Sequence, residues 1–349
     1  MLRSIPPAAR LARRSLAYSA RPFSSSSPAP LARKKVTTLS LLAKQRKAQP
    51  ITMVTAYDYP SAVHVDAAGM DLILVGDSVA MVELGMDTTQ PVTMDAMIHH
   101  CQAVRRGARS PLLVGDMPFG SYEVNDEEAL RNAYRFVKEA GMDAVKIEGN
   151  RPSTVRKLVS SGVAVMGHVG LTPQAISVIG GFRAQGRTAV KARQVLDDAL
   201  ELQEAGAFAV VLECVPAPVA KAVTEALEIP TIGIGAGSGT SGQVLVYHDM
   251  LGMTSNPHHE QFMPKFCKAY AAVGKAIHEG LGEFKKEVES GAFPSDEYSP
   301  YHMSKAEEAL FGAMMAEDAA KRQQEKGEIG KKLQAQDEYE ALNLYGKGD

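Results

Sequence analysis

Eight short apolar runs, separated by longer polar stretches, constrain the fold of this chain more than any other feature of its sequence. The runs are rich in β-branched residues and lie between residues 50 and 248. Near-continuous apolar strands that alternate with helices are typical of a parallel sheet buried on both faces. The expected strands are Ile51–Thr55, Leu72–Val75, Leu112–Val114, Ala144–Ile147, Val163–Met166, Ala209–Leu212, Thr231–Ile234 and Val244–Tyr247.

Helical segments separate most of these strands, and eight such units match a closed (β/α)₈ TIM barrel, whose usual size is about 250 residues. An open, doubly wound sheet is the alternative, because periodicity alone does not separate the two. We expect the barrel to occupy residues 36–290. Residues 291–349 are expected to form a charged C-terminal tail, helical or disordered, because residues 302–349 hold seven basic and ten acidic side chains.

The first 35 residues are typical of a targeting segment rather than of a folded one. They contain six Arg, a run of serines at 24–27 and no Asp or Glu, as mitochondrial transit peptides do. Arg interrupts each apolar stretch that could serve as a secretory signal. Arg21-Pro22-Phe23-Ser24 resembles a matrix-protease cleavage site. We therefore expect import into the mitochondrial matrix and removal of this flexible presequence; a basic tail without an import role is the alternative.

Composition excludes several other classes of protein. The three cysteines show no CxxC spacing, which argues against a disulfide scaffold or a thiolate zinc site and fits a reducing compartment. From Asp58, the first acidic residue, the chain carries 27 basic and 40 acidic residues, so a nucleic-acid partner is not expected. No stretch approaches 18 consecutive apolar residues, so no membrane span is expected either.

Ionisable side chains fall where five successive strands end. Active sites of barrel enzymes are built at the carboxyl ends of the strands. Charges that face a packed barrel interior are costly unless they pair with one another or bind a metal. Such a set indicates a functional site, and its members are Asp77, Asp116, Lys146, Glu148, His168 and Glu213.

Three of these residues, Asp77, Asp116 and Glu148, predict a divalent-metal site. Carboxylate oxygens are hard ligands that suit Mg²⁺ or Mn²⁺, and acids placed close together without a cation would repel one another. For any one of them, a helix cap or a turn is the simpler interpretation.

Lys146 is expected to attract an anionic substrate, and a Schiff-base lysine is the alternative. A salt bridge to Glu148, which lies two residues further on and therefore on the same face, fits either interpretation. His168 could be a metal ligand, an acid–base group, a hydrogen-bond donor or a structural residue.

Glu213 follows an apolar strand and is the candidate for proton transfer, with an ion pair or a helix cap as the alternative. Cys214 is expected to fill the core on the opposite face. The GxGxxG spelled by Gly237, Gly239 and Gly242 does not indicate a dinucleotide site, because a strand rather than a helix is expected to follow it.

Together these side chains suggest enolate chemistry. A 2-oxo acid could chelate the metal through its carboxylate and ketone oxygens, and the metal would stabilise the charge that develops when the neighbouring C–H bond loses its proton. The enolate would then attack an electrophilic carbon.

Six stretches of the chain, in order, resemble the ketopantoate hydroxymethyltransferase (3-methyl-2-oxobutanoate hydroxymethyltransferase) family, over about residues 37 to 282. They are Thr55-Ala56-Tyr57-Asp58, Val75-Gly76-Asp77-Ser78, Gly115-Asp116-Met117-Pro118-Phe119, Val145-Lys146-Ile147-Glu148-Gly149, Gly167-His168-Val169-Gly170-Leu171-Thr172-Pro173-Gln174 and Ile232-Gly233-Ile234-Gly235-Ala236-Gly237.

The resemblance implies a barrel of the phosphoenolpyruvate-binding superfamily, a Mg²⁺ ion and a homo-oligomer, decameric in studied bacterial members. It implies transfer of a one-carbon unit from 5,10-methylenetetrahydrofolate to 3-methyl-2-oxobutanoate, giving 2-dehydropantoate for pantothenate and coenzyme A synthesis. A metal-dependent 2-oxo acid lyase or aldolase of the same superfamily is the alternative, and a catalytically inactive scaffold is a third.

Carried over by motif, the metal-side acids are Asp77, Asp116 and Glu148. The oxo acid would contact Asp77, Ser78, Asp116 and Lys146, with His168 close by, and Glu213 takes the place of the family's proton acceptor. Three positions depart from the family pattern: Ala80 and Asn150 where glycine is usual, and Ser241 where an aspartate is common.

Overall fold

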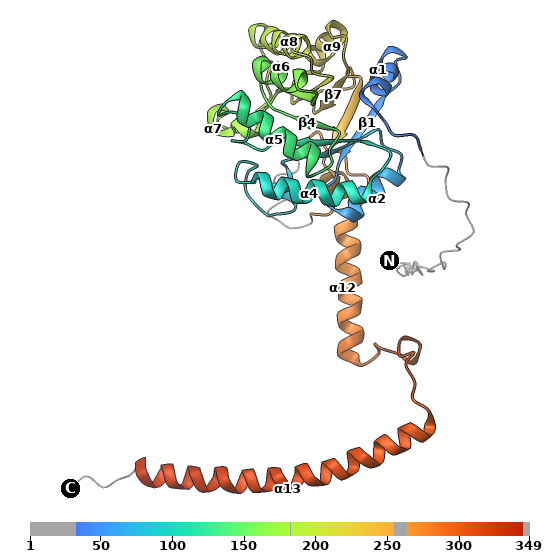
Figure 1. Cartoon of the computed structure of the whole chain (residues 1–349), viewed down its shortest axis with the longest axis vertical. Coiled ribbons are helices and arrows are strands. Elements are labelled where there is room, and N and C mark those ends of the chain that lie inside the picture. The colour runs from blue at the N-terminus through green and yellow to red at the C-terminus, as the bar shows by residue number, and fades with distance from the viewer. Residues whose placement is uncertain (1–32, 182, 255–263, 345–349) are drawn as a thin grey trace, which may run out of the picture. The chain divides into compact units, whose positions relative to one another are not determined.

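Eight parallel strands close into a barrel in the order β1 to β8, in a computed structural model that describes residues 33–181, 183–254 and 264–344 (Figure 1). The closed ladder confirms the predicted barrel and excludes the open sheet. The strands are β1 (Ile51–Thr55), β2 (Leu72–Val75), β3 (Leu112–Asp116), β4 (Ala144–Lys146), β5 (Ala164–Gly170), β6 (Ala209–Glu213), β7 (Thr231–Ile234) and β8 (Gly242–Leu245).

Helices follow most of the strands and surround the barrel (Figure 1). The helices of the described residues are α1 (Thr38–Arg46), α2 (Tyr59–Ala67), α3 (Val79–Val82), α4 (Met94–Gly107), α5 (Asp126–Lys138), α6 (Pro152–Ser160), α7 (Ile176–Ile179), α8 (Ala189–Glu204), α9 (Ala217–Ala226), α10 (Tyr247–Leu251), α12 (Val273–Ser290) and α13 (Lys305–Leu344), with short 3₁₀ turns η1 (Pro173–Ala175) and η2 (Asp296–Tyr298).

Two strands differ clearly from their expected bounds. β5 runs on to Gly170, because Gly167 and His168 keep pairing with β6; His168 therefore lies within the strand and not after it. A β-carbon at Gly167 would lie 2.9 Å from the Leu202 side chain of α8, so glycine here allows the helix to pack closely. β8 begins at Gly242, beside Ile51 of β1, and Tyr247 starts α10 instead of ending the strand.

Alternate residues of each strand point into the barrel and form its inner core, which includes Leu72 of β2, Leu112 and Val114 of β3, and Met166 of β5. The residues between them, such as Val145 and Ile147, belong to the outer core under the helices, as predicted. Four of the inward-pointing series reach a polar residue toward the carboxyl end of the barrel: Asp116, Lys146, His168 and Glu213. The chain thus changes from apolar to charged along the barrel axis.

The opposite end of the barrel interior is covered by α1. Leu41 of this helix is 1% exposed and packs with the inner core. Lys44, one turn further along, places its Nζ 2.6 Å from Asp71 Oδ2, just before β2. The short helix is therefore held to the barrel by one buried leucine and one partly buried ion pair.

We expect Leu41→Ala to lower the free energy of unfolding by about 2–5 kcal/mol, because it removes a large side chain from a closely packed core. Denaturant titration monitored by circular dichroism measures this change. Leu39→Ala in the same helix is the matched control, since Leu39 is 75% exposed and its loss should cost at most about 0.5 kcal/mol. Equal effects of the two substitutions would show that α1 does not close the barrel.

Contacts divide the chain into two units, residues 1–275 and 276–349. The second unit holds most of α12, the turn η2 and the 40-residue helix α13. Within it, the Phe293 ring packs 5.6 Å from the Phe284 ring and 5.8 Å from the Tyr298 ring. The tail is thus helical over much of its length, while the expected boundary at residue 290 stays a prediction. In the described residues no helix has both the length and the apolar character needed to cross a bilayer.

Candidate active site

The carboxyl end of the barrel brings the expected ionisable residues together in one buried cluster. Asp77 follows β2, Asp116 and Lys146 end β3 and β4, Glu148 follows β4, and His168 lies in β5. All five are between 1% and 5% exposed. The sequence-based prediction that strand ends converge on one site is therefore confirmed in its geometry, while the roles of the residues stay predictions.

Lys146 lies at the centre of the cluster. Its Nζ is 2.8 Å from Asp116 Oδ1 and 3.4 Å from Glu148 Oε1. Burial alone would lower the pKa of Lys146, but the charges of Asp116, Glu148 and Asp77 outweigh it and raise the pKa above its ordinary value. Lys146 is therefore an ammonium ion at neutral pH, which favours anion binding over the Schiff-base alternative, since a protonated amine is not a nucleophile.

His168 connects the centre of the cluster to its edge. Its Nδ1 lies 3.5 Å from Glu148 Oε1, and its Nε2 lies 3.3 Å from Glu213 Oε2, at an angle outside the hydrogen-bond range. Burial and Lys146 lower the pKa of His168, but Glu148 and Glu213 outweigh them and raise it to about 9. Lys146 Nζ also lies 3.3 Å from His168 Nδ1, so side chains of the cluster lie near both ring nitrogens, which favours a hydrogen-bonding role over a metal ligand.

The pKa values of the three buried carboxyl groups are shifted in different directions. Burial, with repulsion from Asp116 and Glu148, raises the pKa of Asp77 well above its ordinary value. Burial also raises the pKa of Asp116, against the attraction of Lys146. For Glu148 the charges of Lys146 and His168 overcome the effect of burial and lower the pKa to about 2. Asp77 and Asp116 are therefore the acids that lack compensating positive charge.

This deficit of charge fits a divalent cation. Three buried acids, Asp77, Asp116 and Glu148, lie around the one ammonium group of Lys146, so an ion of charge +2 would offset their excess negative charge. Asp116 Oδ1 is buried and accepts no hydrogen bond in the described part of the chain, although Lys146 lies near it. Carboxylate oxygens are the ligands that Mg²⁺ prefers. The residues present therefore fit the predicted ion.

The described side chains do not by themselves form a complete set of ligands around one point. Among the described residues no three His, Cys, Asp or Glu side chains are placed to bind one ion together. Both oxygens of Glu148 are engaged, Oε1 near Lys146 and His168 and Oε2 by the Gln174 N–H at 3.1 Å. Mg²⁺ is commonly held by one or two carboxylates, with water and substrate completing its shell. The oxygens of Asp116 are engaged as well, Oδ1 by Lys146 at 2.8 Å and Oδ2 by the Asp77 N–H at 3.1 Å, so Asp77, Asp116 and Glu148 all stay predicted ligands.

Ser78 follows Asp77 and extends the site toward β1. Its Oγ lies 2.8 Å from the Tyr57 hydroxyl, and Tyr57 is fully buried. Burial raises the pKa of Tyr57, so the hydroxyl keeps its proton. Ser78 is thus held in place by a neutral phenol at the edge of the cluster.

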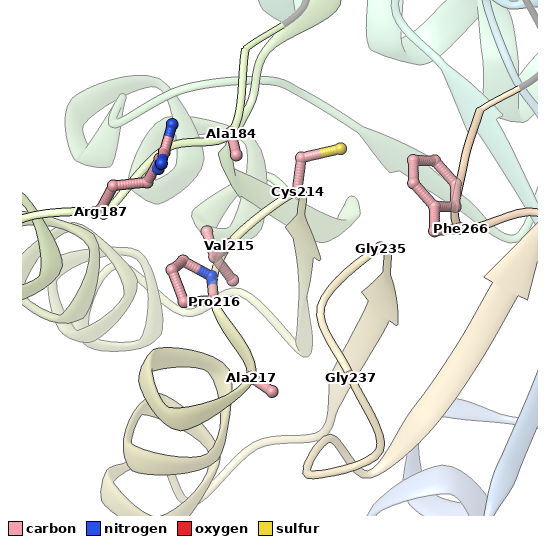
Figure 2. A pocket seen from close by; sticks show the side chains of 9 residues that line it. All are labelled: Ala184, Arg187, Cys214, Val215, Pro216, Ala217, Gly235, Gly237 and Phe266. Carbon is pink, nitrogen blue, oxygen red and sulfur yellow. The ribbon is translucent and has the colours of Figure 1, made fainter.

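Glu213 occupies the rim, with its side chain 16% exposed. The next residue, Cys214, has a φ of +50°, which L-residues rarely adopt. This turn ends the pleat, so Cys214 does not fill the core as predicted; instead it lines a cavity of about 370 Å³ with Arg187, Pro216, Gly235 and Phe266. Figure 2 shows the Cys214 thiol on the side of the cavity that faces Phe266.

Sequence reasoning missed two polar residues that support the cluster. Gln174, in η1, donates through Nε2 to Asp77 Oδ2 (2.9 Å) and to the Met117 carbonyl (3.0 Å). Tyr122 donates to Gln174 Oε1 and accepts a bond from the Glu148 N–H. Gln174 lies in one of the stretches that resemble the family, and this resemblance could have identified it. Tyr122 lies in none of those stretches, so nothing in the sequence pointed to it.

The three departures from the family pattern leave the cluster intact. Ala80 is buried in α3 within the outer core. Ser241 lies at the amino end of β8, where its hydroxyl accepts a bond from the Thr231 N–H, so it is at the opposite end of the barrel from the site. Asn150 donates to Asp198 and Glu201 of α8 on the surface. Among the described residues, none of these three side chains forms a hydrogen bond with the buried acids or with Lys146.

A parallel barrel with buried acids and cations at its carboxyl end defines an enzyme of the (β/α)₈ class. Residues 35–296 match the family model described as ketopantoate hydroxymethyltransferase, and the chain belongs to that family. It is 59% identical over 277 residues to mitochondrial 3-methyl-2-oxobutanoate hydroxymethyltransferase 1 of Oryza sativa subsp. japonica (78% of this chain, 76% of the relative). It is also 52% identical to 3-methyl-2-oxobutanoate hydroxymethyltransferase of Heliobacterium modesticaldum, over 76% of this chain and 95% of the relative.

Among solved structures, phosphonopyruvate hydrolase in complex with oxalate and Mg²⁺ shares the fold. Its TM-score is 0.50 at 13% sequence identity, over 81% of this chain and 98% of that protein. The likeness confirms the type of barrel predicted from the sequence. At this identity it carries nothing about the reaction.

Proposed function

We propose that this enzyme transfers a hydroxymethyl group from 5,10-methylenetetrahydrofolate to 3-methyl-2-oxobutanoate, giving 2-dehydropantoate and tetrahydrofolate with uptake of water. Membership of the family supports the formation of 2-dehydropantoate. The observation that carries the proposal in the structure is the buried set of acids around Lys146 at the carboxyl end of the barrel. The folate cosubstrate rests on the family resemblance.

Asp77, Asp116 and Glu148 would hold Mg²⁺. When bound, the ion would polarise the ketone of the oxo acid and stabilise the negative charge that develops on its oxygen. Burial, with repulsion from Asp116 and Glu148, raises the pKa of Asp77, and a nearby cation would favour its carboxylate form.

Lys146 and Ser78 would orient the oxo acid. The Lys146 ammonium attracts its carboxylate, and the hydroxyl of Ser78, fixed by Tyr57, can donate a hydrogen bond to it. Because these groups are buried, the anion would be held out of water, which strengthens each charged contact.

Glu213 would take the proton from C3 of the oxo acid. It lies at the rim of the cluster, with its Oε2 3.3 Å from His168 Nε2, so His168 can help to orient its carboxyl group. The carbon that loses its proton would then attack the one-carbon unit of the folate donor.

Turnover of 3-methyl-2-oxobutanoate with methylenetetrahydrofolate and Mg²⁺ tests the proposal directly. We expect 2-dehydropantoate to form only when all three are present, and chelation of the metal to abolish the reaction reversibly. Product formation should be followed by mass spectrometry. Cleavage of an oxo acid with Mg²⁺ and no folate would instead establish the lyase or aldolase alternative, and no turnover of either kind would establish a scaffold.

We also propose that the N-terminal segment is a mitochondrial transit peptide. Residues 1–32 lie outside the described residues, and relatives from two plants carry mitochondrial names. Arg33 donates to the Asp66 and Met70 carbonyls and Lys35 pairs with Asp143, so cleavage that preserves these contacts falls before residue 33. A reporter fused to residues 1–32 should enter the matrix; a cytosolic reporter would contradict the proposal. Assembly into a homo-oligomer stays a prediction.

A further inference from the structure

Gln174 forms hydrogen bonds with residues that follow several strands around the site. It follows β5, yet its contacts reach Asp77 after β2, Met117 after β3 and Glu148 after β4. It is 2% exposed, and Gln90 donates to its carbonyl oxygen at 2.9 Å. The ends of four neighbouring strands are therefore tied together through one glutamine.

The side-chain amide of Gln174 has only one orientation that satisfies its neighbours. Its two N–H groups point at acceptors, Asp77 Oδ2 and the Met117 carbonyl, while its oxygen accepts the Tyr122 hydroxyl at 2.5 Å. A flipped amide would place an oxygen against a carboxylate and a carbonyl, and a donor against the hydroxyl. The amide is thus locked, and it engages one defined oxygen of Asp77.

We infer that Gln174 is a positioning residue for the cation site. By holding Asp77 Oδ2, its side chain would leave Asp77 Oδ1 for a bound ion and would fix the position of the Asp77 carboxylate relative to Asp116. Asp77 is bound to Asp116 from the other side as well, since its N–H donates to Asp116 Oδ2 at 3.1 Å. The backbone of Asp77 therefore positions the Asp116 carboxylate, and the Gln174 amide positions the Asp77 carboxylate.

Groups that orient metal ligands commonly contribute about 10- to 100-fold to the affinity of the site. The inference rests on the proposed function only in assuming that Asp77 and Asp116 bind a divalent ion. It adds a residue whose effect reaches the ion through Asp77 rather than by contact with the reactants.

Binding of Mn²⁺ to the purified protein, without oxo acid or folate, provides the test. Electron paramagnetic resonance of free Mn²⁺ gives the dissociation constant. We expect Gln174→Met, which keeps the length but removes both donors, to weaken Mn²⁺ binding by about tenfold or more. Gln174→Asn should do the same, because the shorter amide cannot reach Asp77, and it serves if the Met variant fails to fold.

Gln203→Ala is the matched control. Gln203 accepts hydrogen bonds from the Glu228 and Ile229 N–H groups just before β7, at the other end of the barrel, so its loss removes structural bonds far from the site. We expect Mn²⁺ affinity within about twofold of wild type. Wild-type affinity in both Gln174 variants, or an equal loss in Gln203→Ala, would overturn the inference while leaving the proposed function in place. If the wild type itself binds no Mn²⁺ and forms no 2-dehydropantoate, it is the proposed function that fails.

Discussion

Lys146→Met should lower kcat/KM for 3-methyl-2-oxobutanoate by at least about 30-fold. Removing one partner of a buried charged contact costs roughly 2–5 kcal/mol, and each 1.4 kcal/mol corresponds to a factor of ten. The protein should also lose about 3–5 kcal/mol of stability at neutral pH, because Asp116 and Glu148 would be left buried without their cation. Both losses have one cause, the central position of Lys146 among the acids.

Steady-state kinetics and denaturant titration measure the two effects. Lys44→Met is the control. Lys44, like Lys146, forms an ion pair with an aspartate, Asp71, but it is only partly buried and lies at the amino end of the barrel. It should cost some stability and leave kcat/KM near the wild-type value. If Lys146→Met kept its activity, the oxo acid would not be held by this side chain.

Glu213→Gln should lower kcat by about 10²–10⁴-fold and leave KM for the oxo acid little changed. The substitution keeps the shape of the side chain and removes only its capacity to accept a proton, and general-base catalysis contributes this much to typical enzymes. Binding depends on other residues, so the effect should fall on turnover.

Glu225→Gln on α9 provides the comparison, because Glu225 is an exposed glutamate paired with Lys221. It should behave as wild type. Exchange of the C3 proton of the oxo acid with deuterated water, followed by NMR, isolates the step: the wild type with Mg²⁺ should exchange it and Glu213→Gln should not. Unaltered exchange in the variant would assign the proton transfer to another group.

The barrel and the placement of its charges could be predicted from the sequence because both follow from short-range rules. Apolar runs such as Leu72–Val75 have few alternatives to a buried parallel strand. Side chains two residues apart share a face, so Lys146 and Glu148 were expected together even though β4 ends at Lys146.

What the sequence did not reveal depends on contacts between distant segments. Gln174 and Asp77 are 97 positions apart in the sequence, and no local pattern around either residue predicts that their side chains form a hydrogen bond. The end of β5 depended on pairing of Gly167 and His168 with β6, which tertiary structure decides. Cys214 was misplaced because a positive φ at a residue other than glycine has no sequence signal.

Anomalous diffraction from crystals grown with Mn²⁺ and 3-methyl-2-oxobutanoate tests the central claim most directly. We expect one strong anomalous peak between the carboxylates of Asp77 and Asp116, with the oxo acid bound to the same ion and its carboxylate near Lys146. An oxo acid seated in this cluster with no manganese beside those two aspartates would contradict the claim.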